Sequence, residues 1–123
     1  MLRTKLELVF FKHKDWPIDW PNGYMARWAH FNLANLSGEG LYLFSGDIER
    51  KEGEIFTFHE TYVANVDFPL IPPEGWEEVK SEIFVGKLIN IHTGSKIIGK
   101  AKLLEYKYYE SYDFVDGKVI VED

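Results

Sequence analysis

Histidine is the residue type best able to do acid–base or metal chemistry, and the chain has four: His13, His30, His59 and His92. No two of them are spaced as H-x-H or H-x3-H, the spacings expected of two imidazoles on one metal ion. There is no cysteine, which excludes a thiol nucleophile and a cysteine-based zinc site. Each histidine falls in or beside an expected strand. The sequence therefore predicts half-buried strand histidines, with no metal and no cofactor.

Serines and carboxylates give little support for catalysis. The serines stand in turn-like contexts, and none lies in a G-x-S-x-G motif. Acidic residues gather in two polar stretches, 47–54 and 74–82, which are expected to be solvated. A catalytic pair would instead need one carboxyl group in an apolar pocket to separate the two pKa values. We find no catalytic motif, although a small hydrolase with a histidine and a carboxylate in a barrel mouth stays open as an alternative.

Residues 14–24 read KDWPIDWPNGY and contain Asp-Trp-Pro twice. The prolines and the Asn-Gly pair exclude a helix and favour a stiff loop. Trp and Tyr dominate the energetics of many protein interfaces. We therefore predict a protein-binding surface formed by Trp16, Trp20 and Tyr24, with Trp76 added from a second loop. The alternative is that these rings fold over the end of the core, where they would bury a large apolar area.

A second candidate surface is a stripe of lysines. Lys96, Lys100 and Lys102 alternate with apolar residues along one expected strand, and Lys87 lies on its hairpin partner. Clustered lysines can bind phosphate groups, so tRNA or RNA is a possible partner. The balance of 14 Lys and Arg against 20 Asp and Glu, a net charge of −6, disfavours it. An ordinary charged outer face, or lysines protecting a sheet edge, is the alternative.

The elements that must position these residues are short strands. Runs with period-two alternation are separated by Gly-, Pro- and Asn-containing turns, and about six to eight strands are expected. They cover approximately residues 4–12, 24–33, 41–44, 55–66, 83–92 and 96–108. Residues 76–82 form the one expected helical turn. YDFV-DG-KVIV, residues 112–121, carries the strongest hairpin signal. The pattern predicts an all-β barrel or sandwich.

The composition sets the broad class of the protein. A chain of 123 residues with 46% hydrophobic and 16% aromatic residues can form one domain with a real core. No run approaches the about 18 apolar residues needed to span a bilayer, and no signal-peptide pattern opens the sequence. Together with the lack of cysteine, this predicts a cytoplasmic protein with no membrane partner.

Three segments, in this order, resemble the C-terminal (third) β-barrel domain of elongation factor Tu. They are NGYMARWAHFNL (22–33), GLYLFSGDIERKEGEIFTFHETYVANVDFPLI (40–71) and GKLINIHTGSKIIGKAKLLEY (86–106). In the third segment the family has an apolar strand, a Gly-rich turn, a basic residue and then Val-Gly-Ala-Gly. The corresponding residues here are Gly94, Ser95, Lys96, Ile98 and Gly99.

The resemblance implies a six-stranded antiparallel β-barrel over residues 1–107, with an added C-terminal β-hairpin in residues 108–123. In the family this barrel contacts the T stem of aminoacyl-tRNA and packs on a GTPase domain. The chain itself has no G-x-x-x-x-G-K-[ST] loop, which excludes a GTPase. Met25 replaces the family's arginine after Gly-Tyr, and Ser95 replaces the second glycine of the turn.

Taken together, the sequence predicts a non-catalytic protein-interaction module. The expected partner is a protein, for example one of the translation apparatus, or a second copy of the chain, and an antitoxin or immunity-type role is compatible. A tRNA- or RNA-binding barrel that uses the lysine stripe is the first alternative, and the small hydrolase is the second.

Overall fold

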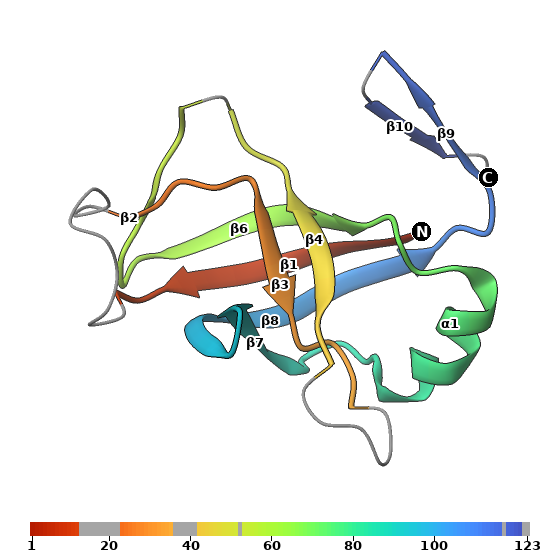
Figure 1. Cartoon of the computed structure of the whole chain (residues 1–123), viewed down its shortest axis with the longest axis horizontal. Coiled ribbons are helices and arrows are strands. Elements are labelled where there is room, and N and C mark those ends of the chain that lie inside the picture. Colours follow the sequence, from red (N-terminus) through yellow and green to blue (C-terminus); the bar gives the residue numbers. More distant parts are fainter. Residues whose placement is uncertain (13–22, 36–41, 52, 117, 122–123) are drawn as a thin grey trace.

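The computed structural model describes residues 1–12, 23–35, 42–51, 53–116 and 118–121, and the account below concerns these residues (Figure 1). The elements in chain order are β1 (Leu2–Phe10), β2 (Gly23–Tyr24), β3 (Trp28–Phe31), β4 (Phe44–Ile48), β5 (Phe56–Thr57), β6 (Thr61–Phe68), α1 (Pro73–Val79), a 3-10 turn (Lys80–Glu82), β7 (Leu88–Thr93), β8 (Lys96–Tyr108), β9 (Tyr112–Val115) and β10 (Lys118–Val121).

Six strands close into a barrel in the order β1-β6-β4-β3-β7-β8, and every neighbouring pair is antiparallel. Strand β1 pairs along most of its length with β6 on one side and with β8 on the other (Figure 1). Strands β9 and β10 form a separate two-stranded sheet. The prediction of a six-stranded antiparallel barrel with an added C-terminal hairpin is therefore confirmed.

The barrel forms because apolar residues alternate along its long strands. In β1, Leu2, Leu6 and Leu8 are buried, whereas Glu7 between them is exposed. In β8, Ile98 points inward and Lys100 outward. The two strands approach most closely at Gly99, where a Cβ atom would lie 2.5 Å from the Val9 carbonyl oxygen. Only glycine fits this position without moving one strand away from the other.

Aromatic rings close both ends of the barrel. At the end where β1 finishes, the Tyr24 ring stacks on Phe10 with centroids 4.6 Å apart, and Phe56 lies 5.6 Å from Phe10. At the other end α1 lies against the barrel, and its Trp76 ring stacks on Tyr108 at 4.9 Å. Trp76 and Tyr108 are both half-buried. The interior between these two ends is packed with apolar side chains.

Several elements differ from the predicted ranges. The strand expected over 24–33 divides into β2 and β3, and the one expected over 55–66 divides into β5 and β6. The second division has a backbone cause, since His59 adopts φ 67° and donates its N–H to the Phe10 carbonyl at 2.7 Å. The helix begins at Pro73, three positions before the expected turn, because proline at the first helical position gives up no hydrogen bond.

The hairpin β9–β10 projects away from the barrel in Figure 1. Its register pairs Val115 with Lys118 and Tyr112 with Val121. Across the described segments, none of the helices combines the length and the apolar character that a membrane span requires.

Candidate functional site

The structure describes two of the four residues of the predicted aromatic surface, Tyr24 and Trp76. Trp16 and Trp20 lie outside the described residues, so their role in binding stays a prediction. Tyr24 is 3% exposed, and its hydroxyl donates to the Trp28 carbonyl at 2.6 Å. Burial raises the pKa of this hydroxyl to about 12. Tyr24 therefore belongs to the aromatic packing at the barrel end, which was the alternative for this residue.

The four lysines of the predicted stripe differ in their surroundings. Lys96, Lys100 and Lys102 are exposed along β8, as predicted. Lys87 instead turns inward and donates to the carbonyls of Leu33 and Glu82, the latter at 2.8 Å. Burial lowers the pKa of Lys87, and the nearby Glu82 partly offsets this effect. Lys87 therefore hydrogen-bonds two backbone carbonyls. These bonds link the segments that contain Leu33, Glu82 and Lys87 itself.

His13 lies outside the described residues, and His30, His59 and His92 belong to no described group suited to a metal ion. His30 and His92 are cross-strand partners on β3 and β7. The described residues contain no group of three or more His, Cys, Asp or Glu side chains suited to a metal ion. His92 is buried, and within the described part of the chain neither of its ring nitrogens has a hydrogen-bond partner. Burial, followed by the charge of His30, lowers the pKa of His92.

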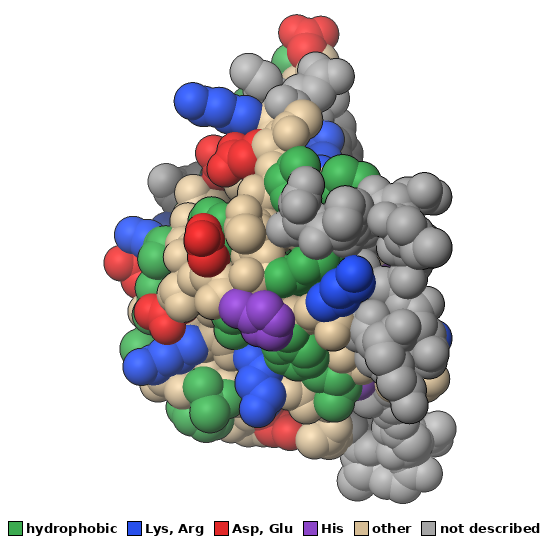
Figure 2. Space-filling model, turned by 90° about the vertical axis from the view of Figure 1, so that its left-hand side faces the viewer, with side chains coloured by type: hydrophobic (Ala, Val, Ile, Leu, Met, Phe, Trp, Pro, Cys, Tyr) green, Lys and Arg blue, Asp and Glu red, His purple; other side chains and the backbone are tan. Residues whose placement is uncertain are grey.

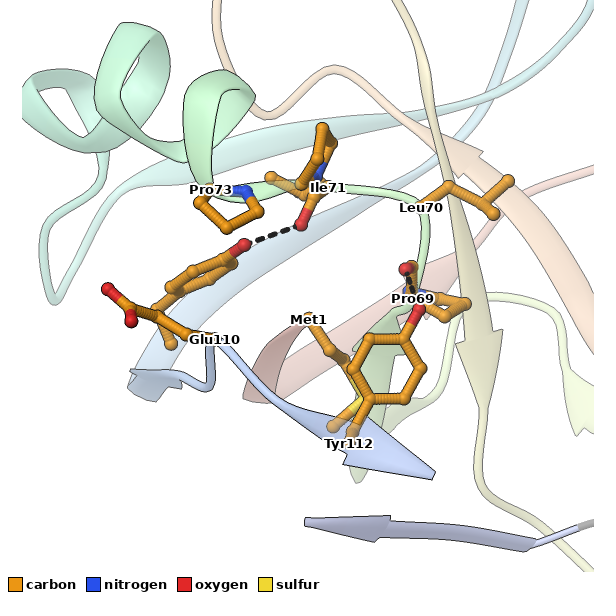
Figure 3. Close-up of a pocket in the computed structure, with 9 residues that line it drawn as sticks. Met1, Pro69, Leu70, Ile71, Pro73, Glu110 and Tyr112 are labelled. Atoms are coloured by element: carbon orange, nitrogen blue, oxygen red, sulfur yellow. Dashed lines mark hydrogen bonds between the residues drawn. The ribbon is translucent and has the colours of Figure 1, made fainter. Parts of the chain in front are cut away.

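An open groove lies between the β6–α1 connection and the chain that follows β8 (Figure 3). Its volume is about 380 Å³. Residues 69–73, Pro-Leu-Ile-Pro-Pro, form one wall. Tyr108, Glu110 and Tyr112 form the other, and Met1 lies between the two walls.

Hydrogen bonds from two tyrosine hydroxyls join the two walls of the groove. The Tyr108 hydroxyl donates to the Ile71 carbonyl at 2.7 Å, and the Tyr112 hydroxyl donates to the Pro69 carbonyl at 2.6 Å (Figure 3). Both bonds join residues far apart in the sequence, and each occupies a backbone acceptor of the proline-rich wall. The groove is therefore shaped by side-chain bonds between its walls and not by a sheet ladder.

The N-terminus completes the base of the groove. The Met1 ammonium group donates to the Tyr109 carbonyl at 2.7 Å, and the Tyr109 N–H donates to the Met1 carbonyl at 2.8 Å. Burial lowers the pKa of this ammonium group. The Met1 side chain is buried, and it lies beside the Tyr112 ring in Figure 3.

Carboxylates give one side of the groove a negative potential. Burial raises the pKa of Tyr108, and Glu110 and then Glu74 raise it further. Both carboxylates therefore lie close enough to act on a hydroxyl in the groove wall. Glu110 and Glu74 are exposed on the surface. The groove thus combines apolar walls with an acidic rim.

Trp76 lies next to this groove, against the ring of Tyr108. Its ring is parallel to Tyr108 within 6° and lies 6.3 Å from Tyr106. The indole therefore supports the tyrosine that lines the groove. The prediction that Trp76 belongs to a binding surface stays a prediction, with this neighbouring position as its structural context.

Sequence reasoning missed the groove itself. FPLIPPEGW (68–76) was expected only to interrupt regular structure, and residues 108–123 only to add a hairpin. The available signal was the coincidence of a proline run with a tyrosine-rich stretch, EYKYYESY (105–112). Nothing in the sequence shows that these two stretches, more than 30 residues apart, form the two walls of one groove.

Comparison of the chain with protein-family models, with curated proteins and with solved structures found no match. The resemblance to the third domain of elongation factor Tu therefore stays a prediction.

Proposed function

We propose that this chain is a non-catalytic protein-interaction module that binds its partner through the outside of the barrel. One observation carries the proposal: apolar packing fills the described barrel, whereas large apolar side chains are exposed outside it. Leu70 at the groove is 76% exposed. Phe84, Val85 and Leu88, which lie within five residues, are each more than half exposed. Several large apolar residues exposed close together in the chain are typical of a protein-binding surface, and Figure 2 shows hydrophobic side chains at the surface of one face of the molecule.

The partner class follows from chemistry and not from a known relative. An apolar surface on a chain of net charge −6 suits a protein surface that combines apolar and basic residues. Trp16 and Trp20 remain part of the proposal as a second contact region. A link to translation is supported only by the resemblance described above, and self-association or an immunity-type role would use the same surfaces.

Affinity capture from the native host tests this function. The native chain should recover a partner that is depleted by Leu70→Ser or by the Trp16→Ala/Trp20→Ala double variant. The thermal midpoint of Leu70→Ser should stay within a few degrees of the native value, because an exposed side chain contributes little to stability. The double variant should also keep its midpoint if both indoles bind the partner, as predicted. Equal recovery of the same proteins by the native chain and by all variants would contradict the proposal. A large fall in the midpoint of the double variant would instead identify both indoles as core residues.

A second candidate function is RNA binding, which is favoured by the exposed Lys96, Lys100 and Lys102 along β8. Glu7 is paired directly with Lys102 in the β1–β8 register and reduces the positive potential there. Binding of tRNA should be salt-dependent and should weaken on Lys96→Glu substitution. Fluorescence anisotropy with labelled tRNA is the measurement, and the lack of any binding at low salt eliminates this candidate.

A further inference from the structure

We infer that the groove between residues 69–73 and the chain after β8 binds an extended segment of a partner protein that carries a bulky apolar side chain next to lysine or arginine. The inference rests on the proposed interaction function and specifies the chemistry of the partner. It is argued from the walls of the groove, from the charges at its rim and from its rigidity.

The walls favour an apolar side chain. Leu70 has the largest exposed fraction among the described large hydrophobic residues, 76%. Prolines contribute three of the nine lining positions and have no backbone N–H to offer a ligand. The carbonyls of Pro69, Ile71 and Pro72 already accept bonds from Tyr112, Tyr108 and the Trp76 N–H. Such a surface gains more from covering apolar area than from direct hydrogen bonds.

The rim favours a cation. Glu110 lines the groove, and Glu74 lies close enough to raise the pKa of Tyr108. The positive groups nearby already have partners: the Met1 ammonium group donates to the Tyr109 carbonyl, Arg3 binds Asp67 through two hydrogen bonds, and Lys107 lies over the Tyr109 ring at 4.9 Å. In the β1–β8 register, Arg3 and Lys107 are paired with each other, whereas Tyr108 is paired with buried Leu2. A lysine or arginine beside the apolar side chain would therefore meet two carboxylates.

The shape favours a peptide over a small molecule. Pockets for small ligands enclose most of the ligand surface, whereas this groove of about 380 Å³ is open to solvent. An extended chain can lie along such a groove and place single side chains in it. Grooves lined by aromatic residues recognise extended segments in this way in several peptide-binding domains.

The walls are also fixed before a ligand arrives. The Tyr108–Ile71 and Tyr112–Pro69 hydrogen bonds hold them together, and Trp76 stacks behind Tyr108. Prolines restrict the backbone of the wall that bears Leu70. A preformed site loses less conformational entropy on binding, so a short segment can bind measurably.

The experiment selects peptides with the whole chain from a phage-displayed library of random dodecapeptides. Enriched peptides are then synthesised, and their dissociation constants are measured by fluorescence anisotropy. We expect them to share a bulky apolar residue next to lysine or arginine. Leu70→Ser should weaken binding about tenfold, which corresponds to the loss of most of one leucine contact. Glu110→Lys should weaken it about fivefold or more, because it replaces an attraction with a repulsion.

Two matched variants serve as controls. Val63→Ser removes an exposed aliphatic side chain, 57% exposed, from strand β6, and Glu105→Lys makes the same charge change on the outer part of β8. Neither residue lines the groove, so both variants should bind the peptides as the native chain does. Thermal midpoints measured by circular dichroism should show that all four variants are folded.

The outcomes separate this inference from the function on which it rests. If the selected peptides bind but Leu70→Ser and Glu110→Lys have no effect, the groove inference fails and the interaction function stands. Peptides that pair an apolar residue with acidic residues, or a library that enriches none, also overturn the groove inference. The proposed function is then decided separately by the capture experiment with whole proteins.

Discussion

At the scale of the residue, His92 shows how burial makes a single side chain sensitive to pH. It is covered by the fold, and its pKa is lowered from the ordinary value of 6.5, first by burial and then by the charge of His30 across the strand pair. The unfolded chain therefore binds a proton at this position more readily than the folded chain does. Stability is full above the unfolded pKa and is lost as the pH falls below it towards the lowered folded pKa.

The free energy of unfolding should therefore decrease as the pH falls from about 7 to about 5. Substitution of His92 by Leu should reduce that slope, because it removes the titrating imidazole. His59→Asn is the control, since His59 is exposed and asparagine tolerates its positive φ of 67°. Urea unfolding at several pH values provides the measurement, and an unchanged slope in the His92 variant would contradict the prediction.

Residue types alone did not reveal the role of Lys87. The alternation of the sequence placed it with three other lysines as a candidate for RNA contact. In the structure its ammonium group bonds the carbonyls of Leu33 and Glu82, which come from segments about 50 residues apart in the chain. A lysine can direct its ammonium group into solvent or donate hydrogen bonds to backbone carbonyls. The position of the neighbouring backbone decides which of the two occurs.

At the scale of the element, α1 is held against the barrel by Trp76. The helix is only seven residues long, and no described side chain caps its N-terminus. So short a helix is marginal by itself and depends on tertiary packing. The stacking of Trp76 on Tyr108 supplies that packing and also supports one wall of the groove.

We therefore expect Trp76→Ala to lower the free energy of unfolding by about 2 kcal/mol, below the range for a fully buried tryptophan because this ring is half-buried. Trp28→Ala is the matched control. Trp28 is 46% exposed on β3, so its loss should cost about 0.5 kcal/mol or less. Denaturant unfolding of both variants tests the difference, and equal costs would show that the stacking does not stabilise α1.

The strands were predictable to different degrees. β1 and β8 were found from their alternation, because each has one buried face. β7 begins at Leu88, five residues later than the strand expected from 83. Gly86 adopts φ 93° there, and the Lys87 N–H bonds the Phe84 carbonyl to close a turn before the strand starts. A turn that contains apolar residues reads as a strand in the sequence, and only the backbone conformation distinguishes the two.

At the scale of the whole molecule, the barrel and the hairpin β9–β10 differ in how they are held. The strands of the barrel each pair with two neighbours, whereas β9 and β10 pair only with each other. The described links from the hairpin region to the rest include the Tyr112–Pro69 hydrogen bond at 2.6 Å. A two-stranded hairpin that pairs with no other strand is only marginally stable. It therefore adds little to the stability of the domain to which it is attached.

Removal of residues 111–123 should therefore leave the barrel folded. We expect the thermal midpoint to fall by about 5 °C, the effect of roughly one lost hydrogen bond in a domain of this size. Differential scanning calorimetry measures the midpoint, and amide hydrogen exchange should still show the strongest protection in β1. An unfolded or aggregated product would show instead that the hairpin is an integral part of the barrel fold.

The sequence by itself determined the all-β class, many of the inward-facing residues and the terminal hairpin. These depend on the alternation of apolar residues and on turn-forming residues, both of which are local properties. Only the tertiary structure decided that Tyr24 is buried, that Lys87 bonds two carbonyls, and that residues 69–73 and 108–112 form one groove. The physical reason is that strand order and chain closure bring distant segments together, and those contacts fix burial, hydrogen-bond partners and the local potential.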